Sequence, residues 1–87
     1  MTDLQVVAEP AEPKYPAGLH IRLRYDADSC HAAVYEGEDY VMSTGYSWIK
    51  SHESWAACRE TALNDAREKV ALIQKYGRPP ANEVVEL

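Results

Sequence analysis

The chain has 87 residues, a formal net charge of −5 and a hydrophobic fraction of 46%. A chain of this length forms one domain, and it buries only about 60–65% of the surface that its unfolded form exposes. The acidic balance argues against a general binder of nucleic acid or of an acidic membrane, because both need a basic field. It suits a partner with a basic surface, and it equally suits plain solubility.

The two cysteines, Cys30 and Cys58, predict a cytoplasmic protein with reduced thiols. No basic and apolar signal precedes them, and no stretch holds the roughly 20 apolar residues of a membrane span. Phenylalanine is absent, so six Tyr and two Trp supply the aromatic volume. Tyr and Trp keep a polar edge when half buried, and they are therefore typical of interfaces.

Residues 1–18 predict a flexible, extended leader. Pro10, Pro13 and Pro16 recur three residues apart, a spacing that forbids a helix and breaks strand ladders. A disordered tail is one interpretation, and docking as an edge strand is another. The apolar residues that would allow such docking are Leu4, Val6 and Val7.

Three short strands are predicted over residues 19–25, 30–35 and 40–44. The first alternates between apolar and basic side chains, and this period of two indicates a half-buried strand. Acidic turns over 26–29 and 36–39 join the strands into an antiparallel meander. Straight alternation puts the following side chains on one sheet face: His20, Arg22, Arg24, His31, Tyr35, Tyr40 and Met42.

A long helix is predicted over residues 51–76. Ser51 is the expected N-cap, Glu53 lies in the expected first turn, and Gly77 is the expected C-cap before two prolines. Asp65 and Lys69 form a favourable i,i+4 pair. Spacings of three and four give an apolar stripe that would face the sheet, and its members are Trp55, Cys58, Ala62, Ala66, Val70, Ile73 and Tyr76.

These elements predict an α+β domain over residues 19–80, a three-stranded antiparallel sheet with one long C-terminal helix packed on one face. Residues 81–87 would be a tail, for which a short strand through Val84 and Val85 and a frayed end are both consistent. One helix covers one face, so the other face of the sheet is expected to stay open.

The residues that could carry chemistry are not arranged for it. Cys30 and His31 are neighbours in a strand, so their side chains point to opposite faces, and no Cys-x-x-Cys or His-x-x-x-His pattern offers a closed metal site. Cys58 lies in the apolar stripe. Asp26-Ala27-Asp28-Ser29 resembles part of a calcium loop but lacks its glycine and distal glutamate. We therefore expect no metal, no cofactor and no enzymatic activity.

The open sheet face is the predicted binding surface, because Arg and Tyr are the residue types that most often dominate binding energy. A merely solvated face is the competing interpretation, since antiparallel sheets commonly face water on one side. The predicted partner-binding residues are Arg22, Arg24, Tyr35, Tyr40 and Met42 on the face, with Glu36, Glu38 and Asp39 at its rim.

The strands, a connecting segment and the helix sequence Glu60-Thr61-Ala62-Leu63-Asn64-Asp65-Ala66-Arg67-Glu68 resemble the antitoxin family HicB over about residues 19–80. The family's Pro/Gly/Cys-containing loop after the second strand is missing here. The resemblance implies binding and masking of a small toxin ribonuclease. In size and acidity the chain is also similar to the small inhibitors, anti-CRISPR proteins among them, that phages direct against bacterial defence systems.

The sequence thus predicts a small acidic, non-enzymatic protein-binding module, an inhibitor that masks a basic, nucleic-acid-handling protein. The alternative is single-stranded nucleic-acid binding on the same face, with bases stacked on Tyr35 and Tyr40 and phosphates bound by Arg22 and Arg24. Homodimerisation through a free sheet edge is left open.

Overall fold

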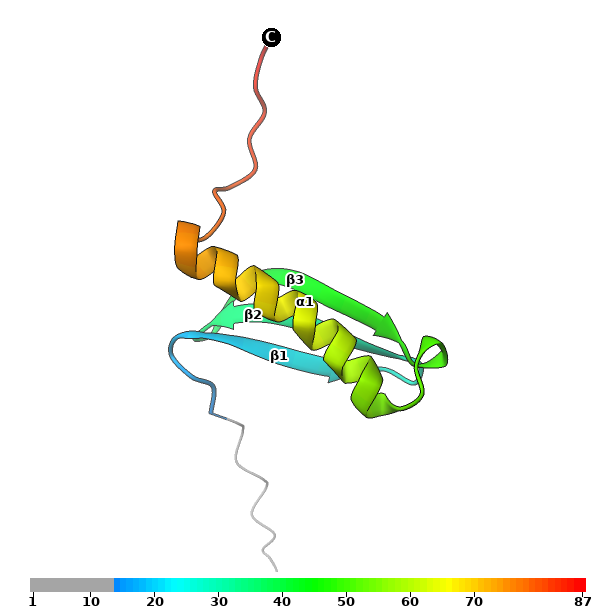
Figure 1. The fold of residues 1–87 in the computed structure, drawn as a ribbon. Helices are drawn as coiled ribbons and strands as arrows, with labels where there is room; N and C mark the ends of the chain where they lie inside the picture. Colours follow the sequence, from blue (N-terminus) through cyan, green and yellow to red (C-terminus); the bar gives the residue numbers. More distant parts are fainter. Residues whose placement is uncertain (1–13) are drawn as a thin grey trace, which may run out of the picture.

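The computed structural model describes residues 14–87, and it confirms the predicted α+β class (Figure 1). Three strands, β1 (Leu19–Tyr25), β2 (Ser29–Glu36) and β3 (Asp39–Trp48), form an antiparallel sheet in the order β1-β2-β3. A short 3-10 turn, η1 (Ile49–Ser51), leads to the helix α1 (Trp55–Tyr76). The expectation of an edge strand through Leu4, Val6 and Val7 lies outside the described residues.

The first two strands pair as their alternation predicts. Ile21 lies opposite Val34 and Leu23 opposite Ala32, so these apolar side chains share one face of the sheet. The helix α1 lies across one face of the sheet (Figure 1), and Ile21 and Leu23 pack against its buried residues. Arg22 lies opposite Ala33 on the other face. Successive side chains of a strand point to opposite faces, so the alternation in these strands matches a sheet with one packed and one open side.

The third strand is twice as long as predicted. It extends to Trp48, and Gly45, which was expected to end it, lies inside it and is buried. Glycine usually weakens a strand interior, but it also marks a place where another backbone approaches closely. A Cβ built on Gly45 would meet the main chain of Ala62 in α1, with the Ala62 Cα 2.6 Å away.

Two irregularities in the pairing of β2 with β3 change which side chains of β3 reach each face. Val34 pairs with Met42 and Tyr35 with Tyr40, so Val41 is an extra residue between the two pairs. Such a bulge reverses the alternation beyond it. The placement of Met42 on the open face was therefore wrong.

Met42 lies on the helix side of the sheet instead. It lines an apolar groove of about 270 Å³ between β3 and the C-terminal half of α1, together with Leu72 and Ile73. A second irregularity follows in β3, where Thr44 and Gly45 together span Ala32 of β2. The Thr44 hydroxyl donates a 3.2 Å hydrogen bond to the Ala32 carbonyl there.

The helix begins later than predicted. Ser54, not Ser51, is its N-cap, and the Ser54 hydroxyl accepts a 3.2 Å hydrogen bond from the Ala57 amide. Ser51 belongs to η1, and Glu53 precedes the first turn of α1. Both serines suit an N-cap locally, and the turn that closes the end of the sheet determines which one takes the position.

The core consists mainly of small side chains. The buried cluster is Cys30, Ala32, Cys58, Ala62 and Ala66, and Ile21, Leu23 and Ile49 pack against it. Small residues on both sides let the helix backbone lie close to the sheet. Buried Ser47 completes the contact, since its hydroxyl donates a 2.5 Å hydrogen bond to the Cys58 carbonyl.

The C-terminal end of α1 extends past the core. Tyr76 is 72% exposed, so its prediction as a sheet-facing residue was wrong. Gly77 ends the helix at φ +83°, and its amide donates to the Ile73 carbonyl at 2.7 Å, as a C-cap glycine does. Residues 81–87 form no strand in the structure, and the segment runs away from the C-terminal end of α1 and from the sheet (Figure 1).

Candidate functional site

The candidate site is the sheet face that α1 does not cover, called the open face below. Its side chains form cross-strand rows, because β1 and β2 pair without interruption and the two bulges of β3 bring every third residue of that strand to this face. The first row is His20, Tyr35 and Tyr40, the second is Arg22, Ala33 and Ser43, and the third is Arg24, His31 and Tyr46. Large side chains at both ends thus flank a central row that has small side chains on β2 and β3.

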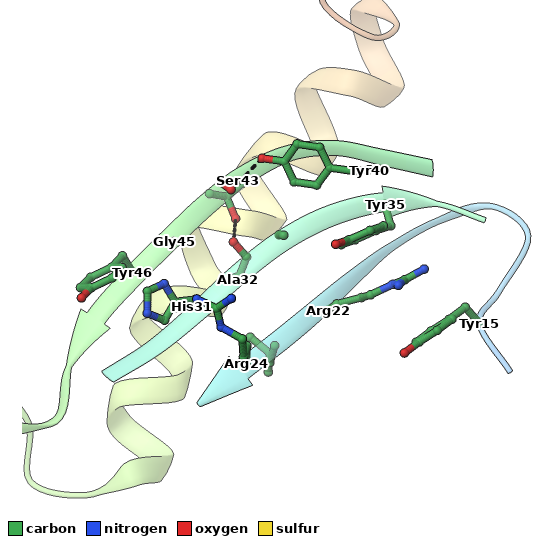
Figure 2. Close-up of a pocket in the computed structure, with 13 residues that line it drawn as sticks. Tyr15, Arg22, Arg24, His31, Ala32, Tyr35, Tyr40, Ser43, Gly45 and Tyr46 are labelled. Carbon is green, nitrogen blue, oxygen red and sulfur yellow. Dashed lines mark hydrogen bonds between the residues drawn. The ribbon is translucent and has the colours of Figure 1, made fainter. Parts of the chain in front are cut away.

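A stack of planar groups stands on the β1 side of the open face (Figure 2). The Arg22 guanidinium carbon lies 3.5 Å from the centre of the Tyr15 ring and 3.7 Å from the centre of the Tyr35 ring. The Arg22 Nη2 donates to the Gly37 carbonyl at 2.9 Å. These contacts make Arg22 a structural link between the leader, the sheet and the second turn.

His20 is part of the same arrangement. Arg22 Nε donates to His20 Nε2 at 3.1 Å, so the imidazole carries its proton on Nδ1, which lies 3.0 Å from the Gly18 carbonyl. The imidazole lies nearly parallel to the rings of Tyr15 and Tyr35, with centres 5.7 and 6.1 Å away. Residues 14–18 are thereby held against the edge of the open face.

Tyr35 and Tyr40 form one end wall of the site. Their rings meet edge to face with centres 5.6 Å apart. The Tyr40 hydroxyl is 2.7 Å from the Ser43 hydroxyl, which fixes the tilt of an otherwise exposed ring. This contact exists only because the bulge at Val41 turns Ser43 to the same face as Tyr40.

His31 and Tyr46 form the opposite wall. Their rings meet edge to face with centres 4.1 Å apart, and Trp48 packs against Tyr46 at 5.0 Å. His31 Nε2 lies 3.0 Å from the Asp26 carboxylate and 3.2 Å from the Ser29 hydroxyl. The imidazole is therefore fixed from the first turn, while the Tyr46 and Trp48 rings stay about half exposed.

Between the two walls lies a trough of about 440 Å³ (Figure 2). Ala33, Ser43 and Thr44 line it between the walls, and Arg22 and Arg24 line its β1 side. Clefts of a few hundred Å³ with aromatic walls and a few polar groups are typical of ligand sites. This one is partly open to solvent, so it suits side chains presented by another molecule.

The trough is the basic region of an acidic protein. Both of its charged residues, Arg22 and Arg24, are cationic, and the carboxylate at its edge, Asp26, is bonded to His31. Arg22 has both planes covered by rings. Arg24 is exposed, and within residues 14–87 no carboxylate lies within 4.0 Å of it. Of the two arginines that line the trough, Arg24 is therefore the one whose guanidinium no described residue holds.

The predicted acidic rim is partly neutralised within the molecule. Arg78 donates to the Glu36 carboxylate at 2.7 Å and lies 3.9 Å from the Asp39 carboxylate. In the part of the chain that is described, Glu38 has no ion-pair partner. The carboxylates of the rim that could contact a basic partner are those of Glu38 and of Asp39, whose side chain is 77% exposed.

The site has residue types of a catalytic triad without triad geometry. The Ser29 hydroxyl and the Asp26 carboxylate both approach the same nitrogen, Nε2 of His31. In a triad the nucleophile and the carboxylate use different ring nitrogens. Ser29 is also only 1% exposed, so its hydroxyl is buried and these contacts fix the first turn.

The two thiols lie in the core. Cys30 and Cys58 are both fully buried, and burial raises the pKa of the Cys30 thiol, with the neighbouring Cys58 thiol adding to the shift. A reactive cysteine needs a lowered pKa and access to solvent. Over residues 14–87, no three His, Cys, Asp or Glu side chains are placed to hold a metal ion. Nor is any described helix long and apolar enough to cross a membrane.

The structure brings together Arg22, Arg24, Tyr35 and Tyr40, four of the residues predicted for partner binding, and excludes Met42. Sequence reasoning missed several further side chains of the site, because predicting them required the true length of β3, its two bulges and the position of the leader. The signal available in the sequence was the spacing of three residues from Tyr40 to Ser43 and from Ser43 to Tyr46 in β3. The missed residues are Tyr15, Ser43, Tyr46 and Trp48.

The fold and the site together define an α+β domain with one packed and one open sheet face. In comparisons with protein-family models, with curated proteins and with solved structures, nothing matches the chain.

Proposed function

We propose that this protein is a non-enzymatic protein-binding module that captures its partner on the open face. The observation that carries the proposal is the trough, with Tyr35 and Tyr40 at one end, His31 and Tyr46 at the other, and Arg24 beside it. Aromatic side chains and arginine are the groups that most often dominate protein interfaces. The helix and the buried core support the sheet that carries this surface.

The arrangement of the open face favours binding over solvation. A solvated face would be expected to carry separate polar side chains, whereas here the rings contact one another at both ends of the trough. Edge-to-face contacts fix the rings before a partner arrives, which lowers the entropy lost on binding. Tyr40, Tyr46 and Trp48 nevertheless keep 41–56% of their surface exposed.

The proposed role within this class is that of an inhibitor that masks a basic, nucleic-acid-handling protein. The net charge of −5 and the exposed rim carboxylates of Glu38 and Asp39 support it, since they would attract a basic surface around the trough. The HicB-like strand and helix order supports the same class of role, as does the anti-CRISPR-like size and acidity.

Partner capture by the tagged full-length protein from its own host tests the proposal. We expect the double variant Tyr40→Ala/Tyr46→Ala to lose the partner that the wild type retains, with its melting temperature nearly unchanged because both rings are half exposed. Tyr76→Ala is the matched control, since Tyr76 is exposed on α1 and away from the open face. Undiminished capture by the double variant would refute the proposal.

Single-stranded nucleic-acid binding remains the second candidate, because Tyr40, Tyr46 and Trp48 present half-exposed rings on one face. Bases stack on such rings without sequence preference. Titration of a labelled oligothymidine at ~50 mM salt distinguishes the candidates, because phosphate contacts are strongest at low salt. Tight binding that weakens as salt rises would favour this candidate, and no binding would remove it.

A further inference from the structure

We infer that the trough recognises an acidic peptide segment of its partner, with a side-chain carboxylate bound by Arg24 and a neighbouring flat or apolar side chain seated over Ala33 and Ser43. This inference rests on the proposed function and adds the chemistry of the partner. It is carried by the charge of the trough, which is opposite to that of the whole chain.

The first step is the state of the two arginines. Arg22 is enclosed by the rings of Tyr15 and Tyr35 and donates to His20 and to Gly37. Arg24 is exposed on the same side of the trough. An arginine fork binds a carboxylate through two parallel hydrogen bonds, and such a pair is strong and directional.

The second step is the shape of the middle of the trough. Ala33 and Ser43 are short, and the walls around them are rings, so a planar or apolar side chain fits between the walls. The Ser43 and Tyr40 hydroxyls, 2.7 Å apart, leave one proton free to be donated. A volume of about 440 Å³ holds one or two side chains of a peptide.

The third step distinguishes a peptide from a nucleic acid, which could also place an anion on Arg24. A nucleic-acid strand brings one phosphate per nucleotide, and its binding depends on several basic contacts along the strand. The trough offers one available arginine in a chain of net charge −5. One available arginine is enough to bind a single carboxylate beside an apolar side chain, but it is too few to bind a run of phosphates.

A selection from a library of random peptides about twelve residues long, displayed on phage, tests the inference against the full-length protein. We expect wild-type protein to enrich Asp or Glu next to an aromatic residue or proline. The leading peptide should bind about tenfold more weakly to Arg24→Gln, since a charge-assisted pair is lost. Arg59→Gln is the matched control, because Arg59 is an exposed arginine of α1 that pairs with Glu60.

The following outcomes would overturn the inference. Enriched peptides without acidic residues, no enrichment, or equal binding by Arg24→Gln would each remove the carboxylate site. An oligothymidine that binds more tightly than the leading peptide, and only when Arg24 is present, would assign the site to phosphate. By contrast, a peptide affinity that rises about tenfold when Glu9 and Glu12 are replaced by Gln would support the carboxylate site, because it would show the chain's own acidic leader competing for it.

The two proposals fail in different ways. If Tyr40→Ala/Tyr46→Ala abolishes capture of the native partner while Arg24→Gln does not, the open face still binds a protein but not through a carboxylate. If neither variant affects capture, the open face is not the binding surface, and the proposed function fails with the inference.

Discussion

Gly45 of β3 lies directly under the backbone of Ala62 in α1, and a Cβ at position 45 would sit 2.6 Å from the Ala62 Cα. A helix backbone approaches a strand this closely only where the strand residue has no Cβ, as glycine does. The contact places α1 against the middle of β3. It therefore fixes which face is packed and which face carries the trough.

We predict that Gly45→Ala destabilises the protein by about 2 kcal/mol or more. Removing a strand glycine normally stabilises by about 0.5–1 kcal/mol, but forced overlap in a packed core costs more, about 1–3 kcal/mol. The overlap here is with main chain, which cannot move aside as a flexible side chain can. Urea unfolding measures the change. Gly18→Ala is the control, because a Cβ there meets nothing within 4 Å, and equal stability of the two variants would contradict the prediction.

A second prediction concerns the start of the helix. Ser54→Ala should lower the free energy of unfolding by about 1 kcal/mol, because it removes the hydroxyl that accepts from the Ala57 amide. Ser51→Ala should change it by less than about 0.5 kcal/mol, since Ser51 is an exposed residue outside α1. Thermal or urea unfolding of the two variants decides the matter. A larger effect at Ser51 would mean that the helix begins earlier than described.

The third prediction concerns Arg22. Replacing Arg22 with Lys should destabilise by about 1–2 kcal/mol, because lysine cannot lie flat between the Tyr15 and Tyr35 rings and also donate to Gly37. Arg24→Lys is the matched control and should leave stability unchanged, since Arg24 is exposed. Urea unfolding measures both variants. Amide NMR shifts of Tyr15, Ala17 and Gly18 should move only in the Arg22 variant.

The fourth prediction concerns stability at alkaline pH. Burial raises the pKa of the Cys30 thiol above its ordinary 9.0. Between pH 9.0 and the raised pKa, the thiol therefore keeps its proton in the folded protein but has lost it in the unfolded chain. Stability is then fully present below pH 9.0 and falls as pH rises through the raised pKa. Urea unfolding at about pH 8 and pH 10 should show a smaller decline for Cys30→Ala than for wild type. Equal declines would mean that other groups cause the loss.

The candidate site could be predicted from the sequence only where the strands alternate without interruption. In β1 and β2, the period of two placed Arg22, Arg24 and Tyr35 on the open face, and the pairing confirms it. In β3 the same rule placed Met42 on the wrong face, because a bulge is a feature of the pairing between two strands. The sequence of β3 contains a spacing of three that fits such a bulge, but it does not show where the bulge lies.

The rim shows a second limit of the same kind. The acidic residues of the second turn were visible in the sequence, but their ion pair with Arg78 was not, since 42 residues separate Glu36 from Arg78. The meander and the long helix bring the two together at one end of the domain. The free charge of a surface thus depends on contacts that the chain makes only after folding.

By itself, the sequence determined the element order, the α+β class, the first strand at residues 19–25 and the end of the helix at Gly77. Each depends on local chemistry, namely alternation, turn residues and a cap. Only the tertiary structure decided the trough, because its walls come from three strands and a leader residue, Tyr15, held in place by two bulges and a stacked arginine. Those relations join residues distant in the chain, and no local pattern encodes them.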